Sequence, residues 1–288
     1  MNIGIIGLGL IGGSIGRAIK KKTNHVVYGL DKDEKTMIKA TLVEAIDYNL
    51  DDTNIKEIDI LIIALYPKAI IECIKQYAPK LKDGAIIIDC GGNKREICKF
   101  MEQMHITYPN IDFIGGHPMA GREFSGFSHS TASLFEKATM LMVPIHNSIE
   151  TLYKVKEFIL ELGFEGVVIT NPIEHDEMIS FTSQLAHIVS SSYIKNPLTT
   201  THYGFSAGSF KDMTRVAKLN PEMWTEIMLD NKDYLVEQID VLTKNLEDYK
   251  KALQENDEEK LSTLLDAGRA IKEEAEKLRN EKTSQRIK

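Results

Sequence analysis

Cysteine is scarce in this sequence, which contains three in 288 residues. Cys73, Cys90 and Cys98 lack the spacing of a metal-ligand set, and three thiols are too few for the disulfide framework of a secreted chain of this length. The count therefore excludes a disulfide-stapled fold and predicts no metal. A reducing compartment such as the cytoplasm fits this usage.

Long apolar runs are missing as well. The longest, at 60–66 and 140–145, are far shorter than the ~20 residues that a membrane-spanning helix requires, and we interpret them as buried strands. The first residues show no basic segment followed by a cleavage pattern, so no secretory signal is predicted. We expect a cytoplasmic protein without a membrane partner.

A positive net charge is also absent, because 42 acidic side chains outnumber 35 Lys and Arg, for a net charge of -7 at pH 7. Nucleic acids and anionic membranes bind basic surfaces, so neither is expected as a partner. The net charge does not exclude a small anionic substrate, since a few local Arg and His side chains can attract it.

Short apolar segments alternate with helical patterns along the first 170 residues, and helical patterns alone follow them. The alternation predicts parallel β-α-β units, and the amphipathic stretches after Pro172 predict a second, all-α part. Strands are expected at 2–7, 26–31, 58–65, 85–89, 113–115, 139–144 and 166–170. Helices are expected at 10–21, 33–40, 67–81, 94–104, 149–162, 174–195, 210–218, 221–255 and 258–280.

A glycine-rich segment, Gly-Leu-Gly-Leu-Ile-Gly at 7–12, lies between the first predicted strand and the first predicted helix. There Gly7 allows a tight turn, Gly9 lets a pyrophosphate approach the backbone, and Gly12 lets the helix pack close to its strand. The amides and the dipole of the helix N-terminus favour negative charge at the same place. A purely structural turn is the weaker interpretation in this context. The predicted cofactor-binding residues of this loop are Gly7, Gly9, Leu10, Ile11 and Gly12.

Asp31 stands at the end of the second predicted strand, 19 residues after Gly12. A carboxylate at this place can accept hydrogen bonds from both ribose hydroxyls of an adenosine. It would repel a 2′-phosphate, although Lys32 softens that repulsion, so NAD is predicted rather than NADP. Capping of the next helix is the competing role for Asp31, but Asp33 can fill it equally well.

The length of 288 residues suits two domains. We expect an α/β Rossmann-type, NAD-binding domain over 1–170 and an all-α helical domain over 171–288 that binds substrate and dimerises. The long helical stretches at 221–255 and 258–280 offer more apolar surface than one small bundle can bury, and twofold pairing is the commonest solution. A homodimer formed through the helical domain is therefore predicted.

One histidine lies among glycines, in Gly-Gly-His-Pro-Met-Ala-Gly at 115–121, in the loop that follows a predicted strand. Ligands of open α/β sheets bind at the carboxyl ends of the strands. Pro118 biases His117 toward an extended backbone, and the glycines leave room for a substrate and a nicotinamide ring. We predict that His117 is a general base. The histidines interpreted as structural are His25, His105, His129, His146, His175 and His202.

Polar residues interrupt apolar helix patterns at 183–187 and 208–215. His187 lies on a polar edge where its helix can face a cleft. Arg215 can offer a planar fork to a substrate carboxylate, and an ion pair with Asp212 is the competing role.

The single tryptophan, Trp224, falls in the first turn of a predicted helix. Asn220 and Pro221 suit the N-cap and first helical positions, which fixes where that helix begins. Packing in a core explains Trp224 as well as a place in a binding site does, so both interpretations stay open.

These segments together resemble the prephenate dehydrogenase family, which includes arogenate dehydrogenases. The resemblance rests on Gly-Leu-Gly-Leu-Ile-Gly-Gly-Ser at 7–14, His-Pro-Met-Ala-Gly at 117–121, and Phe-Lys-Asp-Met-Thr-Arg at 210–215 with Trp224. It covers nearly the whole chain, and the last two segments are the specific ones. It implies an NAD-dependent oxidative decarboxylation of prephenate to 4-hydroxyphenylpyruvate, in tyrosine biosynthesis, by a homodimer.

The resemblance also implies roles for single residues. His117 matches the catalytic histidine, which withdraws the proton of the ring hydroxyl while hydride passes to NAD and carbon dioxide leaves; no metal is needed. Arg215 matches the arginine that binds a substrate carboxylate, and Asp31 matches the ribose-binding acid. The predicted substrate-binding residues are Arg122, Glu123, His187, Asp212, Arg215 and Trp224, of which Glu123 and Asp212 match carboxylates around the arginine.

One segment departs from the family pattern. Many members have Asp-x-Gly-Ser-x-Lys after a sheet strand, whereas this chain has Asp-Cys-Gly-Gly-Asn-Lys at 89–94. The serine hydroxyl that would assist the histidine and the substrate is missing at Gly92. Asn93 or a water molecule is the candidate to replace it.

Three alternatives remain at this point. An arogenate dehydrogenase would act on a substrate with an amino group in place of the keto group, and the sequence does not choose between the two. A β-hydroxyacid dehydrogenase or imine reductase would place a catalytic lysine in the helical domain, where Lys211 is the obvious candidate. A non-catalytic, NAD-responsive binding protein would not need both His117 and Arg215 beside an intact cofactor loop.

Overall fold

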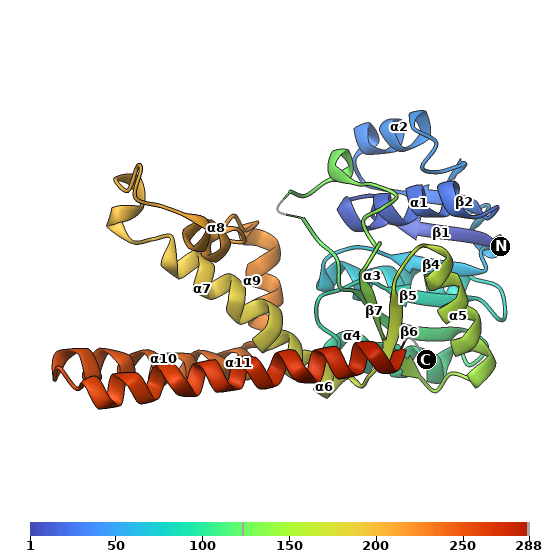
Figure 1. Cartoon of the computed structure of the whole chain (residues 1–288). Helices are drawn as coiled ribbons and strands as arrows, with labels where there is room; N and C mark the ends of the chain where they lie inside the picture. The colour runs from blue at the N-terminus through green and yellow to red at the C-terminus, as the bar shows by residue number, and fades with distance from the viewer. Residues whose placement is uncertain (123, 287–288) are drawn as a thin grey trace. The chain divides into compact units, whose positions relative to one another are not determined.

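The computed structural model describes residues 1–122 and 124–286, with side chains as far as Leu278 (Figure 1). The chain forms two compact units, Met1–Leu235 and Val236–Lys288. The first unit contains the sheet and several helices, and the second is built from helices.

The first unit holds one eight-stranded sheet in the order β3-β2-β1-β4-β5-β6-β7-β8. Neighbouring strands are parallel except β6 and β7. The strand order reverses between β1 and β4, which is the position where sheets of this kind bind ligands. The strands are β1 (Asn2–Ile6), β2 (Val26–Leu30), β3 (Tyr48–Asn49), β4 (Ile60–Ile63), β5 (Ile86–Asp89), β6 (Asp112–Pro118), β7 (Thr139–Ile145) and β8 (Gly166–Ile169).

Helices cover both faces of this sheet (Figure 1). Ile60 and Ile62 of β4 belong to one core cluster, with α1 and α5, whereas Leu61 and Ile63 belong to the other, with α3 and α4. Each buried side chain of this size contributes about 1.5–3 kcal/mol, so burial on both faces explains why the strands are apolar throughout. These helices are α1 (Leu10–Lys22), α2 (Glu34–Leu42), α3 (Pro67–Tyr77), α4 (Arg95–Thr107) and α5 (Ile149–Glu161).

The strand β6 differs from its prediction in length and direction. It continues to Pro118, so His117 lies within the strand and not in a loop after it. Parallel pairing was wrong for β6 and β7, which run antiparallel with His117 opposite Leu141. Antiparallel strands need no crossover helix, and the described residues of the connection between them include a short 3₁₀ turn, Phe127–His129. The two-residue, exposed β3 was not predicted, because it carries no apolar signal.

The rest of the first unit is helical. It contains α6 (Pro172–Ile179), a π-helical turn (Ser180–Leu185), α7 (Ala186–Tyr193), α8 (Gly208–Thr214) and α9 (Pro221–Asp230). Other 3₁₀ turns lie at Ile55–Glu57, Ala78–Lys80 and Pro197–Thr200.

The predicted helix 221–255 is two helices, α9 and α10 (Lys232–Gln254). They are separated at Asn231, which is fully buried and leaves the helical conformation at φ -117° and ψ 25°. Its side-chain amide donates to the carbonyl of Asp176 at 2.8 Å and to Oε1 of Gln184 at 2.9 Å. These tertiary bonds compete with helix continuation, as asparagine side chains often do.

The second unit consists of α10 from Val236 onward and α11 (Glu258–Arg286). The Tyr249 hydroxyl donates to the carbonyl of Leu264 at 3.1 Å and ties the two helices together. Ala252 is buried, but other apolar side chains are more than half exposed in the single chain: Val241, Leu246, Leu253, Leu265 and Ile271. Within the described residues, every helix is too short or too polar to cross a membrane.

Candidate active site

The glycine loop after β1 is held in a conformation that needs glycine. Gly7 has φ +89°, and its N–H donates to the carbonyl of Leu30 at 2.8 Å. A Cβ atom at Gly7 would collide with the carbonyl oxygen of Ala64, and one at Gly12 would collide with the carbonyl oxygen of Gly7. At Gly9 a Cβ atom would meet nothing within 4 Å, so this side of the loop is open.

The N-terminus of α1 is suited to an anion. Gly9 is the N-cap and supplies no side chain to the first amides, and the first turn, which includes Leu10 and Ile11, contains no acidic residue. The orphan amides and the positive end of the helix dipole therefore remain available to a phosphate. The open side at Gly9 and these amides fit the pyrophosphate of a dinucleotide.

Asp31 lies directly beside the glycine loop. Its Oδ2 accepts a hydrogen bond from the N–H of Leu8 at 2.7 Å, and its Oδ1 accepts one from the N–H of Asp33 at 2.9 Å. The cap of α2 is Asp33, whose side chain accepts from the amides of Lys35 and Thr36. The competing role considered for Asp31 is therefore filled by its neighbour.

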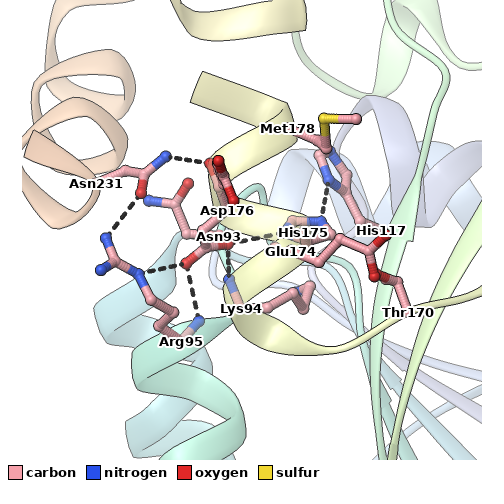
Figure 2. A network of polar contacts seen from close by, with 12 residues as sticks. Asn93, Lys94, Arg95, His117, Thr170, Glu174, His175, Asp176, Met178 and Asn231 are labelled. Atoms are coloured by element: carbon pink, nitrogen blue, oxygen red, sulfur yellow. Dashed lines mark hydrogen bonds and ion pairs between the residues drawn. The ribbon is translucent and has the colours of Figure 1, made fainter. Parts of the chain in front are cut away.

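His117 lies at the carboxyl end of β6 and contacts a second histidine. Its Nδ1 is 3.0 Å from Nε2 of His175, and Nδ1 of His175 is 2.7 Å from Oδ1 of Asp176. Figure 2 shows the three side chains one after another. His175, interpreted from the sequence as structural, is thus the partner of the predicted base. The sequence held a weak signal, a His-Asp pair near the start of a predicted helix.

Burial dominates the electrostatics of these three groups. It lowers the pKa of His117 well below 6.5, and the nearby His175 and Lys94 lower it further. Burial also lowers the pKa of His175, despite the opposing hydrogen bond to Asp176. For Asp176 burial raises the pKa, but hydrogen bonds from His175 and from the amides of Arg95 and Lys94 outweigh it and hold the pKa below 3.8. At neutral pH both imidazole rings are therefore neutral, and Asp176 is an ionised carboxylate.

A buried ion pair lies next to the hydrogen-bonded series of His117, His175 and Asp176. Lys94 and Asp89 have fully buried side chains, and Nζ of Lys94 donates to Oδ2 of Asp89. Asp89 also accepts from the amides of Gly91 at 2.7 Å and Gly116 at 3.0 Å. The pair therefore ties the end of β5 to the residue before His117. Loss of one partner would leave an uncompensated buried charge.

Asn93, one of the two candidates to replace the missing serine, bonds to residues of the helical part. Its Nδ2 donates to the carbonyl of Ile227 at 2.8 Å and to Asp230 at 3.1 Å, and its Oδ1 accepts from Gln184 at 2.8 Å. The side chain thus links the loop after β5 to α9 and to the π-helical turn. The hydrogen-bond partner of His117 is His175 instead.

A second group of predicted residues meets on the helices of the first unit. The rings of His187 and Trp224 are 4.0 Å apart between centroids, and Nδ1 of His187 donates to the carbonyl of Val216 at 3.2 Å. Burial lowers the pKa of His187, and the charge of Arg215 lowers it further. As predicted, Asn220 caps α9 by accepting from the amide of Met223 at 3.1 Å, which places Trp224 in the first turn.

The remaining predicted residues are exposed or outside the described part of the chain. Arg122 is exposed after β6, Asp212 is exposed on α8, and Arg215 is exposed at the C-cap of α8. Glu123 lies outside the described residues. Within those residues, no hydrogen bond or ring contact joins His117 to the group around His187.

Taken together, a glycine loop at the switch point of a parallel sheet, an acid after β2 and a histidine at the same sheet edge define a class. The class is a Rossmann-fold dehydrogenase with a helical second part. The family model described as prephenate dehydrogenase, nucleotide-binding domain, matches residues 15–170, and the one described as prephenate dehydrogenase, dimerization domain, matches residues 171–267. The chain belongs to the prephenate dehydrogenase family.

Individual relatives agree with this membership. Prephenate dehydrogenase of Lactococcus lactis subsp. cremoris is 31% identical over 282 residues, covering 94% of this chain and 77% of that protein. Cyclohexadienyl dehydrogenase of Zymomonas mobilis subsp. mobilis is 30% identical over 267 residues, covering 89% of each chain. The structure of Aquifex aeolicus prephenate dehydrogenase with hydroxyphenyl propionate and NAD+ superposes with a TM-score of 0.81 at 26% identity, over 96% of this chain and 98% of that one. The predicted family, fold class and enzyme class are confirmed.

Proposed function

We propose that this chain catalyses the NAD-dependent oxidative decarboxylation of prephenate to 4-hydroxyphenylpyruvate, a step of tyrosine biosynthesis. The observation that carries the proposal is the place of His117. Strands β1, β4, β5 and β6 are parallel, so His117 at the end of β6 and the glycine loop at the end of β1 lie at the same edge of the sheet. A base and a dinucleotide at one edge are what this oxidation requires.

His117 acts as the general base. Its lowered pKa keeps the ring neutral at physiological pH, so it can withdraw the proton of the substrate's ring hydroxyl. Charge that develops on that oxygen helps to expel the hydride, and carbon dioxide leaves as the ring becomes aromatic. Bound NAD would supply the acceptor for the hydride. The protein's own task is mainly to bind and orient the substrate.

The cofactor site we propose uses the loop described above. The amides at Leu10 and Ile11 would hold the pyrophosphate, Gly7, Gly9 and Gly12 would let it approach, and Asp31 would bind the ribose. The NAD+ present in the Aquifex aeolicus structure supports this choice of dinucleotide.

The substrate site we propose centres on Arg215. A substrate with two carboxylates needs a local cation in a chain of net charge -7, and a guanidinium can bind a carboxylate with two parallel hydrogen bonds. His187 and Trp224 form the aromatic wall beside it. The other residues assigned to substrate binding are Arg122, Glu123 and Asp212.

We further propose that residues 1–170 form the NAD-binding domain and residues 171–288 the substrate-binding and dimerisation domain. The family models change from one to the other between residues 170 and 171, which supports this boundary. The exposed apolar side chains of α10 and α11 support a homodimer formed through the helical domain.

Steady-state kinetics with prephenate and with arogenate, each with NAD and with NADP, tests the proposal. We expect the highest kcat/KM for prephenate with NAD. A higher value for arogenate would identify an arogenate dehydrogenase. Binding of NAD without turnover of either substrate would contradict the proposal and favour a non-catalytic binding protein.

A further inference from the structure

His117, His175 and Asp176 form a continuous chain of hydrogen bonds (Figure 2), with separations of 3.0 Å and 2.7 Å. His175 and Asp176 are 2% and 1% exposed, so water does not compete for these bonds. This series of hydrogen bonds ends on the carboxylate of Asp176, and the ionisation state of that carboxylate decides where each proton lies.

The surroundings of Asp176 require an ionised carboxylate. The amide of Lys94 donates to Oδ1 at 2.7 Å, and the amide and Nε of Arg95 donate to Oδ2 at 3.0 and 3.2 Å. Asp176 thus also lies at the N-terminus of α4, where the helix dipole favours negative charge. An ionised carboxylate only accepts hydrogen bonds. Nδ1 of His175 must therefore carry its proton and donate it.

The proton on Nδ1 of His175 fixes the other positions. His175 is neutral because its pKa is lowered by burial, so its Nε2 carries no proton and can only accept. The bond between the two rings then requires His117 to donate from Nδ1. Since the pKa of His117 is also lowered by burial, Nε2 of His117 carries no proton.

We propose that His175 and Asp176 are positioning residues that hold His117 with its proton on Nδ1, and so leave Nε2 as the atom that accepts the substrate's proton. The identity of the substrate rests on the proposed function, whereas the proton positions follow from the contacts and from the burial that keeps both rings neutral. The opposite arrangement would set a bare Nδ1 of His175 against an ionised carboxylate, which puts two acceptors together without a proton between them.

The proton transfer balances within this chain of residues. The O–H bond of the substrate hydroxyl breaks and an N–H bond forms at Nε2 of His117, which becomes an imidazolium protonated on both nitrogens. Its Nδ1–H still donates to His175, and the carboxylate of Asp176 beyond stabilises the new positive charge. After the product leaves, the imidazolium releases the proton to water.

The charged groups around the two rings are Lys94, Asp89 and Asp176. Lys94 lowers the pKa of both histidines, but its ammonium is paired with Asp89, so its effect is partly offset. Protonation of His117 removes the base, and its pKa lies below 6.5. The kcat/KM profile should therefore stay flat as the pH falls through 6.5 and decline only in more acid solution.

Two substitutions of His175 separate positioning from bulk structure. His175→Leu removes the acceptor, and we expect kcat with prephenate to fall at least ~10-fold while the Kd for NAD is unchanged. His175→Gln places an amide oxygen near the position of Nε2, so it should recover most of the lost kcat. His105→Leu is the matched control, because His105 is half-buried and lies 3.4 Å from a backbone carbonyl, that of Ile111, away from this network. It should leave kcat unchanged.

Nitrogen-15 spectra of histidine-labelled protein report the proton positions without any substrate. The His117 signals are identified by their loss in His117→Asn. We expect a protonated Nδ1 and a bare Nε2 in the wild type, and a mixture in His175→Leu. A wild-type His117 with its proton on Nε2 would overturn the proposal even if prephenate is oxidised. The expected spectrum in a protein that does not oxidise prephenate would support the proton positions and contradict the proposed function.

Discussion

Asparagine in place of His117 removes the base but keeps a polar contact, because its amide can still donate to Nε2 of His175. We expect His117→Asn to lower kcat with prephenate by about 10²–10⁴-fold, the usual range for loss of a general base. The Kd for NAD should stay the same, since the glycine loop is untouched. Steady-state kinetics and a fluorescence titration measure the two quantities, and an unchanged kcat would remove His117 from the mechanism.

The choice of cofactor depends on the charge of Asp31. Asp31→Ser should weaken NAD binding and raise the relative kcat/KM for NADP, because a carboxylate that repels the 2′-phosphate is gone. Asp33→Ser is the matched control: it removes the same charge two residues away and keeps a good helix cap. If both variants keep the wild-type ratio of NAD to NADP, Asp31 does not select the cofactor.

Single residues can be predicted from the sequence where they follow a predicted element at a fixed spacing. The glycine loop and Asp31 could be found because each follows a predicted strand at a fixed distance. The partnership of His117 with His175 could not, since 58 residues separate them and only the packing of α6 against the end of β6 and the start of α4 brings them together. The same holds for the links that Asn93 makes.

Asn231 lies between α9 and α10, and its hydrogen bonds should contribute measurably to the free energy of unfolding. Asn231→Ala would take a buried donor away from Oε1 of Gln184 and from the carbonyl of Asp176, which costs about 1–3 kcal/mol for each group left unsatisfied. Arg95, which is partly exposed, keeps its bonds to Asp233. We expect a loss of at least ~2 kcal/mol in urea unfolding. Asn220→Ala, at an exposed cap, should cost only ~1 kcal/mol. Equal losses would mean that the buried bonds add nothing beyond a cap.

The elements that the sequence predicts least well are those set by tertiary contacts. The helical spacing of apolar residues continues on both sides of Asn231, so the sequence predicts a single helix over 221–255. Likewise, β6 contains a short apolar segment as its parallel neighbours do, and in the described residues of the connection to β7 there is a 3₁₀ turn but no crossover helix. Strands β1, β2, β4 and β5 were predicted to within two residues at each end, because each is a short apolar run with a clear turn after it.

The whole molecule should be a dimer. Val241, Leu246, Leu265 and Ile271 are 58–68% exposed in the single chain, more apolar surface than an isolated helical hairpin usually leaves uncovered. Light scattering at micromolar concentration should give twice the chain mass of 32.5 kDa. The double variant Leu265→Glu with Ile271→Glu should shift the mass toward one chain, whereas Lys260→Glu, an exposed change on the same helix, should not. A wild-type mass of 32.5 kDa would rule the dimer out.

The order of a sheet domain and a helical part could be predicted from the sequence, because the periodicity changes once along the chain. The division into two compact units could not be predicted from the sequence. It falls between Leu235 and Val236, inside α10, because α6, α9 and the π-helical turn bond to the residues that follow β5 and so belong to the first unit.

Oxidation and decarboxylation of prephenate, with His117 as the base, would yield two products that can be measured in one reaction. The most direct measurement follows NADH by absorbance and carbon dioxide by trapping after prephenate and NAD are added to the wild-type protein. We expect one NADH and one carbon dioxide for each prephenate consumed, and a rate at least about 10²-fold lower for His117→Asn. NADH without carbon dioxide, or no NADH from a protein that binds NAD, would show that this chain does not catalyse the reaction.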